Sequence, residues 1–205
     1  MRKKKFWIIL AILVTTLVSG TVLAVSDIYT VQKGDSLWKI AVKYQIGLSE
    51  IIGANPQFKN PDLIYPGDKV TVPNIDEIKA VEAEVIRLTN AERAKYGLSA
   101  LKNNWELSRV ARYKSGDMRD NKYFGHTSPV YGGPFQMMSD FGIRYSAAAE
   151  NIAKGYLSPS AVVRGWMNSS GHRANILNAN YTQIGVGLAI DSSGTYYWTQ
   201  MFIRP

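Results

Sequence analysis

The chain has 205 residues, with 24 basic and 16 acidic side chains and no cysteine. Four of the basic residues lie within the first five positions, so the rest of the chain, with 20 basic and 16 acidic residues, has a net charge of only +4. A charge this small does not indicate a nucleic-acid-binding protein. The lack of cysteine excludes a disulfide framework.

The first 26 residues are expected to form a signal peptide. Residues 2–5 are basic and residues 6–18 are continuously apolar, which is typical of an export signal. Cleavage sites are offered by VLA at 22–24 and AVS at 24–26. The alternative is an uncleaved anchor over residues 6–25, which just reaches the length that a bilayer needs. Since secreted animal domains usually carry disulfides, an exported chain without cysteine indicates a Gram-positive source.

Residues 27–73 are expected to form a small unit of two strands and two short helices. Ser36 is placed to cap a helix whose apolar residues follow helical spacing up to Tyr44. Ser49 is placed to cap a second helix, which must end before Pro56 because the residue before proline avoids helical ψ. A turn then leads into a strand over residues 69–72.

This unit resembles a LysM module along its whole length. The resemblance rests on the first strand near Tyr29, the GDSL turn at 34–37, the Asn-Pro pair at 55–56 and the Pro-Gly pair at 66–67. It implies a βααβ fold that binds N-acetylglucosamine-containing glycans such as peptidoglycan or chitin. It also implies that two turns lie side by side as the glycan site, with the residues Gly34, Asp35, Ser36, Leu37, Ile64, Tyr65 and Pro66. Backbone groups there would pair with acetamido groups, and Ile64 and Tyr65 would offer apolar surface to a sugar ring.

Residues 74–80 are interpreted as a polar linker, and residues 81–205 suffice for one further domain. Apolar spacing predicts helices over residues 81–97, 105–121, 134–141 and 159–168. Two strand-like runs follow at 184–190 and 195–202, joined by a DSSG hairpin turn. Helices followed by paired strands indicate an α+β domain.

Five ordered motifs lie within this second domain. They are FGHTSP at 124–129, AENIA at 149–153, GWMN at 165–168, GHRANIL at 171–177 and IGVG at 184–187. Together they resemble the CAP domain, in its bacterial form, of cysteine-rich secretory proteins, venom antigens and plant pathogenesis-related proteins. The resemblance extends from residue 82 to 203. It implies an α-β-α sandwich with a cleft that holds two histidines and one or two carboxylates.

The residues expected in that cleft are His126, Glu150, His172 and Ser169, with both histidines in loops. Two neutral imidazoles and the Glu150 carboxylate could bind zinc or another divalent metal. Without a metal they could act as base and acid, or form a purely structural hydrogen-bonded pair. CAP cavities often have a second glutamate shortly after the tryptophan of the Gly-Trp motif, but Ser169 and Ser170 stand there in this chain. This departure weakens a metal site, because fewer anionic ligands compensate the ion.

These features predict a secreted protein of the cell wall or spore. Its LysM module would bind peptidoglycan, and its CAP domain would carry an extracellular activity that the sequence leaves open. The spore assignment rests on the resemblance of this module arrangement to bacterial spore-coat and wall proteins. The alternative is a hydrolase of wall peptides or glycans, either metal-dependent or based on His and Glu, with LysM as its tether. Contact with a membrane is expected only through an uncleaved signal segment.

Overall fold

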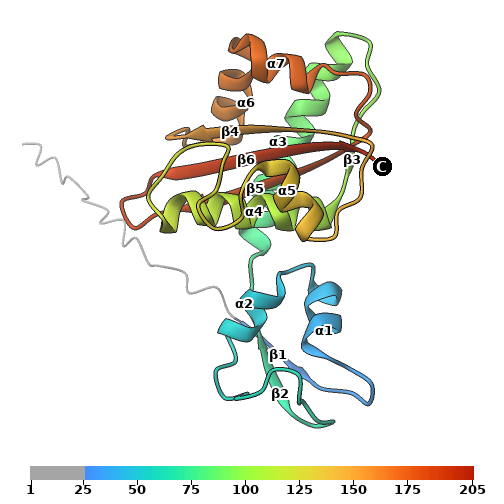
Figure 1. Ribbon diagram of the computed structural model, residues 1–205, viewed down its shortest axis with the longest axis vertical. Helices are drawn as coiled ribbons and strands as arrows, with labels where there is room; N and C mark the ends of the chain where they lie inside the picture. The colour runs from blue at the N-terminus through green and yellow to red at the C-terminus, as the bar shows by residue number, and fades with distance from the viewer. Residues whose placement is uncertain (1–25) are drawn as a thin grey trace, which may run out of the picture.

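The computed structural model describes residues 26–205, which form two domains (Figure 1). Apart from Ser26, the expected signal peptide lies outside the described residues. Within the described part of the chain, no helix combines the length and the apolar character needed to cross a membrane.

The smaller domain has the expected βααβ order. Its elements are β1 (Asp27–Thr30), α1 (Leu37–Tyr44), α2 (Leu48–Gly53) and β2 (Lys69–Val72). The two strands pair antiparallel, with Asp27 opposite Val72. The predicted cap of α1 is confirmed, because the Ser36 hydroxyl accepts a hydrogen bond of 3.2 Å from the Lys39 N–H.

The buried side chain of Asn55 joins α2 to β2 in this domain. Its amide nitrogen donates to the backbone oxygens of Ile51 and Thr71, both at 2.7 Å. Its amide oxygen accepts from the Thr71 N–H at 2.8 Å. Asn55 thus satisfies backbone groups that the short helix and the edge of the two-stranded sheet would otherwise leave unpaired.

The larger domain is built around a four-stranded sheet in the order β3-β5-β6-β4. The strands are β3 (Lys102–Asn103), β4 (Ala147–Lys154), β5 (Gln183–Ile190) and β6 (Tyr196–Arg204). The predicted hairpin is confirmed, since β5 and β6 pair antiparallel on either side of the turn at residues 191–194. Strand β4 pairs antiparallel with the other edge of β6.

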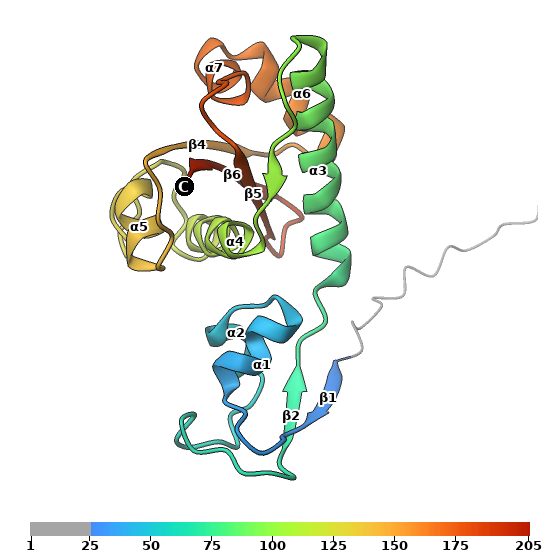
Figure 2. The same ribbon diagram turned by 90° about the vertical axis from the view of Figure 1, so that its right-hand side faces the viewer.

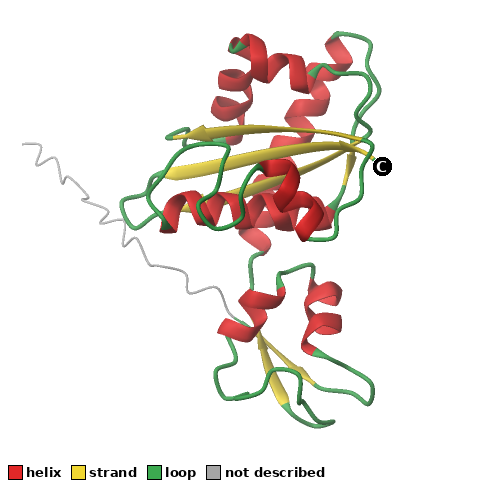
Figure 3. Ribbon diagram, in the orientation of Figure 1, coloured by secondary structure: helices red, strands yellow, loops and turns green. Residues whose placement is uncertain are grey.

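Helices cover both faces of this sheet, which confirms the α-β-α sandwich (Figures 1 and 3). One layer contains α4 (Trp105–Asp120) and α5 (Pro134–Asp140). The other contains α3 (Asp76–Lys95), α6 (Pro159–Asn168) and α7 (Ser170–Ile176). Figure 2 shows α3 running along the side of the domain from its junction with the smaller one. Trp166 and Trp198 are fully buried in the core between this layer and the sheet.

Two glycines in β5 allow α4 to lie directly against the sheet. A Cβ atom at Gly185 would overlap the backbone of Leu107 and Ser108. One at Gly187 would overlap the backbone of Ala111 and Arg112. The IGVG motif therefore has a packing explanation, because close approach of the helix requires residues without side chains.

The linker expected at residues 74–80 is wrong, since α3 begins at Asp76. Asp76 and Glu77 are polar because they occupy the first helical turn, where acidic side chains interact favourably with the helix dipole. Ile78 packs against the core of the larger domain. The chain therefore passes from β2 into α3 with only a few residues between them.

Two further expectations are corrected at the level of local structure. Ser49 does not cap α2, because the helix starts at Leu48 after Gly47, and Ser49 lies inside its first turn. His172 is not in a loop but in α7. Strand β4 was not expected at all: two buried polar residues, Glu150 and Asn151, interrupt its apolar pattern.

Candidate functional site

His126 and Glu150 form a hydrogen-bonded pair in the CAP-like domain. His126 belongs to the loop between α4 and α5, and Glu150 lies in β4 opposite Met201 of β6. The His126 Nδ1 atom is 2.7 Å from Glu150 Oε1. The side chain of Glu150 is 1% exposed, whereas that of His126 is 53% exposed. The pair therefore consists of a buried carboxylate and a solvent-accessible imidazole.

The Glu150 carboxylate tunes this imidazole. Its hydrogen bond raises the pKa of His126, and partial burial opposes the increase. Because Nδ1 is engaged, Nε2 is the ring nitrogen left to exchange a proton with water or a ligand. The second carboxylate oxygen of Glu150, Oε2, is buried without a hydrogen-bond partner. Glu150 thus retains accepting capacity within the protein interior.

A buried lysine supports the loop that carries His126. Lys114 of α4 donates to the backbone oxygen of His126 at 2.8 Å and to the Tyr123 hydroxyl at 2.9 Å. Tyr123 in turn donates to Asp117, which also accepts from Asn121 at 2.7 Å. Burial lowers the pKa of Lys114 and raises that of Tyr123. The sequence places Lys114 on the same helical face as Val110 and Met118, and a lysine on such an apolar face was the available sign of a buried network.

His172 lies near this pair but is held differently. Its backbone oxygen accepts a hydrogen bond of 3.2 Å from the Asn151 side chain. Asn151 also bonds to the side chains of Gln200 and Asn175, so it links β4 to β6 and α7. Burial and the nearby charge of His126 lower the pKa of His172. The pKa values of the two histidines are therefore shifted in opposite directions.

The described residues do not form the metal site considered from the sequence. Between residues 26 and 205 no group of three or more His, Cys, Asp or Glu side chains is placed to hold a metal ion. The His126 nitrogen nearest to Glu150 is used in their hydrogen bond. Ser169 lies at the junction of α6 and α7 and makes no side-chain capping bond. The observed arrangement fits a hydrogen-bonded pair better than a zinc centre.

The two turns expected to bind glycan in the smaller domain lie beside each other. Gly67 donates to the backbone oxygen of Val31 at 2.9 Å, and Val31 donates to that of Asp68 at 2.9 Å. These bonds bring the segment before Gly34 against the segment that follows Pro66. Tyr65 is 64% exposed at this edge. Gly34 and Pro66 are also exposed, so the edge combines two exposed turns with an exposed aromatic ring.

Three of the expected glycan-binding residues have structural roles here. The side chain of Leu37 is 2% exposed and belongs to the core, so only the backbone of this residue is left for a glycan contact. The Asp35 carboxylate accepts from the Gln32 N–H and the Tyr29 hydroxyl, both at 2.8 Å, and these bonds lower its pKa. Ser36 caps α1. The remaining surface consists of Gly34, Tyr65 and Pro66, with the partly buried Ile64 beneath them.

Comparisons with known families divide the chain in the same way. Residues 29–73 match the model of the LysM domain. Residues 86–202, more than half of the chain, match the model of the CAP or cysteine-rich secretory protein family.

Two relatives from Bacillus subtilis match parts of this chain. The uncharacterized protein YkwD of Bacillus subtilis is 56% identical over 126 residues, 62% of this chain and 48% of that protein. SpoIVD-associated factor A of the same species is 57% identical over 47 residues, 23% of this chain and 12% of that protein.

Among solved structures, an extracellular protein containing an SCP domain from Bacillus anthracis matches with a TM-score of 0.59 and 33% identity. The match covers 68% of this chain and 47% of that one. This chain thus spans about half or less of each relative's length. The chain belongs to the cysteine-rich secretory protein (CAP) family and carries a LysM domain ahead of its CAP domain.

Proposed function

We propose that this protein is exported and binds N-acetylglucosamine-containing glycans of the bacterial cell wall or spore through its LysM domain. The observation that carries the proposal is the exposed edge formed by Gly34, Tyr65 and Pro66 beside the hydrogen-bonded turns. An exposed aromatic ring can lie against a pyranose face, and polar groups at exposed turns can pair with acetamido groups. The CAP domain would then be held at the glycan surface.

Two relatives support the location. The spore coat assembly protein ExsA of Bacillus cereus, which is 53% identical over 47 residues, is named for a role in the spore. The structural relative from Bacillus anthracis is described as an extracellular protein. These names support export and association with a wall or spore, and the basic and apolar start of the chain agrees with them.

Sedimentation with insoluble peptidoglycan tests this proposal. A protein of residues 26–205 should pellet with the polymer, and N-acetylglucosamine oligomers should release it. A few hundred millimolar salt should not release it, because the basic and acidic residues of positions 27–73 are equal in number. Release by salt alone would show that charge, not sugar, holds the protein.

A second function is favoured by the His126–Glu150 pair. A carboxylate that holds Nδ1 and raises the pKa of an exposed imidazole is an arrangement suited to a general base acting on water. In this alternative the protein hydrolyses wall peptides or glycans while LysM tethers it. Mass spectrometry of soluble fragments released from peptidoglycan decides between the two. A hydrolase loses fragment release in His126→Ala but still pellets with the wall, whereas a pure binding protein releases no fragments in either form.

A further inference from the structure

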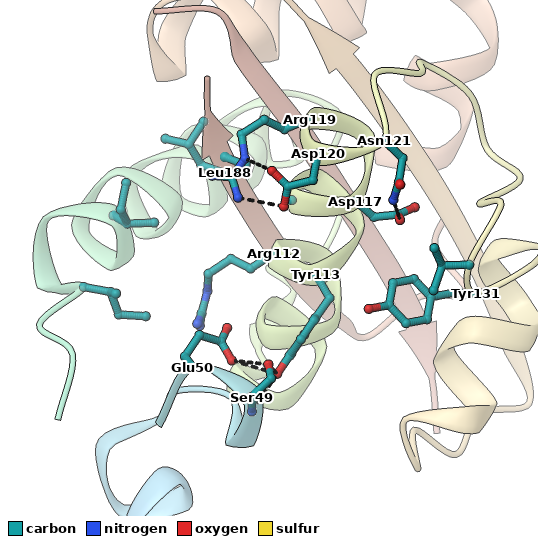
Figure 4. Close-up of a pocket in the computed structure, with 15 residues that line it drawn as sticks. Ser49, Glu50, Arg112, Tyr113, Asp117, Arg119, Asp120, Asn121, Tyr131 and Leu188 are labelled. Atoms are coloured by element: carbon teal, nitrogen blue, oxygen red, sulfur yellow. Dashed lines mark hydrogen bonds and ion pairs between the residues drawn. The ribbon is translucent and has the colours of Figure 1, made fainter. Parts of the chain in front are cut away.

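A tyrosine of the CAP domain makes direct contact with the LysM domain. The Tyr113 hydroxyl, on α4, donates to Glu50 Oε2 at 2.7 Å and accepts from the Ser49 N–H at 3.4 Å (Figure 4). The Ser49 hydroxyl also hydrogen-bonds to it. Burial raises the pKa of Tyr113 to about 12, so its hydroxyl remains a donor at neutral pH. One CAP side chain therefore engages three groups in the first turn of α2.

Gly47 permits this approach. Its backbone angles, φ −79° and ψ 156°, are open to any L-residue, so the backbone itself does not demand glycine. A Cβ atom at this position would overlap the Tyr113 hydroxyl and the Glu50 carboxylate. Glycine at position 47 therefore leaves room both for the Glu50 carboxylate and for the Tyr113 hydroxyl that bonds to it.

Two more contacts join the same faces of the domains. Lys79 of α3 donates to the backbone oxygen of Tyr44, at the end of α1, at 2.8 Å. The guanidinium of Arg109 on α4 lies 5.6 Å from the Trp38 ring of α1 and 5.5 Å from the Phe141 ring. Arg109 is largely buried between these aromatic groups, a favourable setting for a cation. The contact region thus includes both LysM helices and two CAP helices.

The contact region is separate from the glycan-binding edge. The LysM helices face the CAP domain, whereas the end of β1 and the start of β2 lie at the far end of the module (Figure 2). The edge near Tyr65 is therefore open while the domains are in contact. Beside the contact, a cavity of about 480 Å³ is lined by Ser49 and Glu50 and by residues of α4 and the following loop, including Tyr131.

We infer that α4 is a docking surface for the LysM domain, and that Tyr113 holds the two domains in one fixed orientation in solution. Tyr113 bonds the LysM domain, and its neighbour Lys114 bonds the loop of His126. The glycan-binding edge and the His126–Glu150 pair are thus positioned from a single helix. A CAP domain docked in this way would meet its target at a set position relative to the bound glycan strand.

Measurement of ¹⁵N relaxation by NMR on residues 26–205 tests this inference without reference to glycan binding. The two domains should share one rotational correlation time in the unsubstituted chain. Gly47→Ala introduces the overlapping methyl group, and Tyr113→Phe removes the hydroxyl while keeping the ring beside Phe141. Each variant should give a shorter correlation time for the LysM domain than for the CAP domain.

Gly53→Ala is the matched control, because a Cβ atom at Gly53, also in α2, would meet no atom within 4 Å. It should keep the shared correlation time, and all variants should still pellet with peptidoglycan. Separate correlation times in the unsubstituted chain would overturn the inference. A shared correlation time in both Gly47→Ala and Tyr113→Phe would also overturn it, when the amide spectra show that both variants are folded.

Discussion

The Nδ1 atom of His126 lies 2.7 Å from Oε1 of Glu150, although 24 positions separate the residues and they come from a loop and a strand. The carboxylate is buried and the imidazole is not. His172 is nearby on α7, but burial acts on it without a carboxylate to compensate. The two histidines therefore have different electrostatic environments, and this difference can be measured.

Glu150→Gln should lower the pKa of His126, because the amide keeps the shape of the side chain but removes the charge that favours the imidazolium. In the unsubstituted chain, NMR titration should place His126 above the ordinary value of 6.5 and His172 below it. Glu77→Gln, at an exposed site in α3, is the control and should change neither value. An unchanged His126 titration in Glu150→Gln would contradict this account of the pair.

The pH dependence of stability should follow from the same shifts. A raised pKa in the folded state means that the contribution of His126 is fully present below 6.5 and is lost as pH rises through its folded pKa. The lowered pKa of His172 has the opposite effect. It destabilises the folded state at low pH, and this destabilisation disappears as pH rises toward 6.5. Denaturant unfolding of the protein and of His126→Ala, compared between about pH 5 and pH 8, should show the variant losing more stability at the acidic end. If His126→Ala lost the same amount of stability at every pH in this range, the account would be contradicted.

Asn55→Ala should destabilise the LysM domain by about 2 kcal/mol or more, because it leaves the Thr71 N–H and two backbone oxygens without partners. Hydrogen exchange of the β2 amides measures the effect. Lys59→Ala, at an exposed position between α2 and β2, should cost less than about 0.5 kcal/mol. Equal protection in the two variants would show that the Asn55 bonds are not what joins α2 to β2.

Gly187→Ala should destabilise the CAP domain by about 3 kcal/mol, because the new methyl group would push α4 away from β5. Gly116→Ala, on α4 itself, meets no atom closer than 3.9 Å and should instead stabilise by up to about 1 kcal/mol through helix propensity. Urea unfolding followed by tryptophan fluorescence checks both, since Trp166 and Trp198 lie in this core. A Gly187→Ala variant as stable as the parent would remove the packing explanation of the IGVG motif.

Much of the fold could be predicted because its local signals agree with its tertiary contacts. The Ser36 cap and the hairpin between β5 and β6 are short-range features that residue types specify directly. Strand β4 could not be found in this way, because Glu150 and Asn151 are buried by a network that forms only in the folded chain. The start of α3 was missed for a similar reason: acidic residues suit both a linker and a first helical turn.

The residues of the candidate sites also differ in how far the sequence could predict them. His126 and Glu150 were paired through family resemblance, and the structure brings them together. Lys114, which supports their loop, could not be assigned this role from the sequence, since its partners are a hydroxyl and a backbone oxygen that only the fold brings to it. Leu37 was assigned to the glycan site from its place in a motif, but its side chain fills the core. Motif position specifies where a residue lies, whereas exposure depends on packing.

Binding of N-acetylglucosamine oligomers by Tyr65→Ala tests the central claim most directly. Tyr65 is 64% exposed at the glycan-binding edge, and Tyr96 is 58% exposed on the CAP domain, so Tyr96→Ala is a matched control. Calorimetric titration of residues 26–205 should show affinity falling about tenfold, about 1.4 kcal/mol, in Tyr65→Ala and staying constant in Tyr96→Ala. An affinity that Tyr65→Ala leaves unchanged, or that no form of the protein displays, would contradict a glycan-binding LysM domain with its site at this edge.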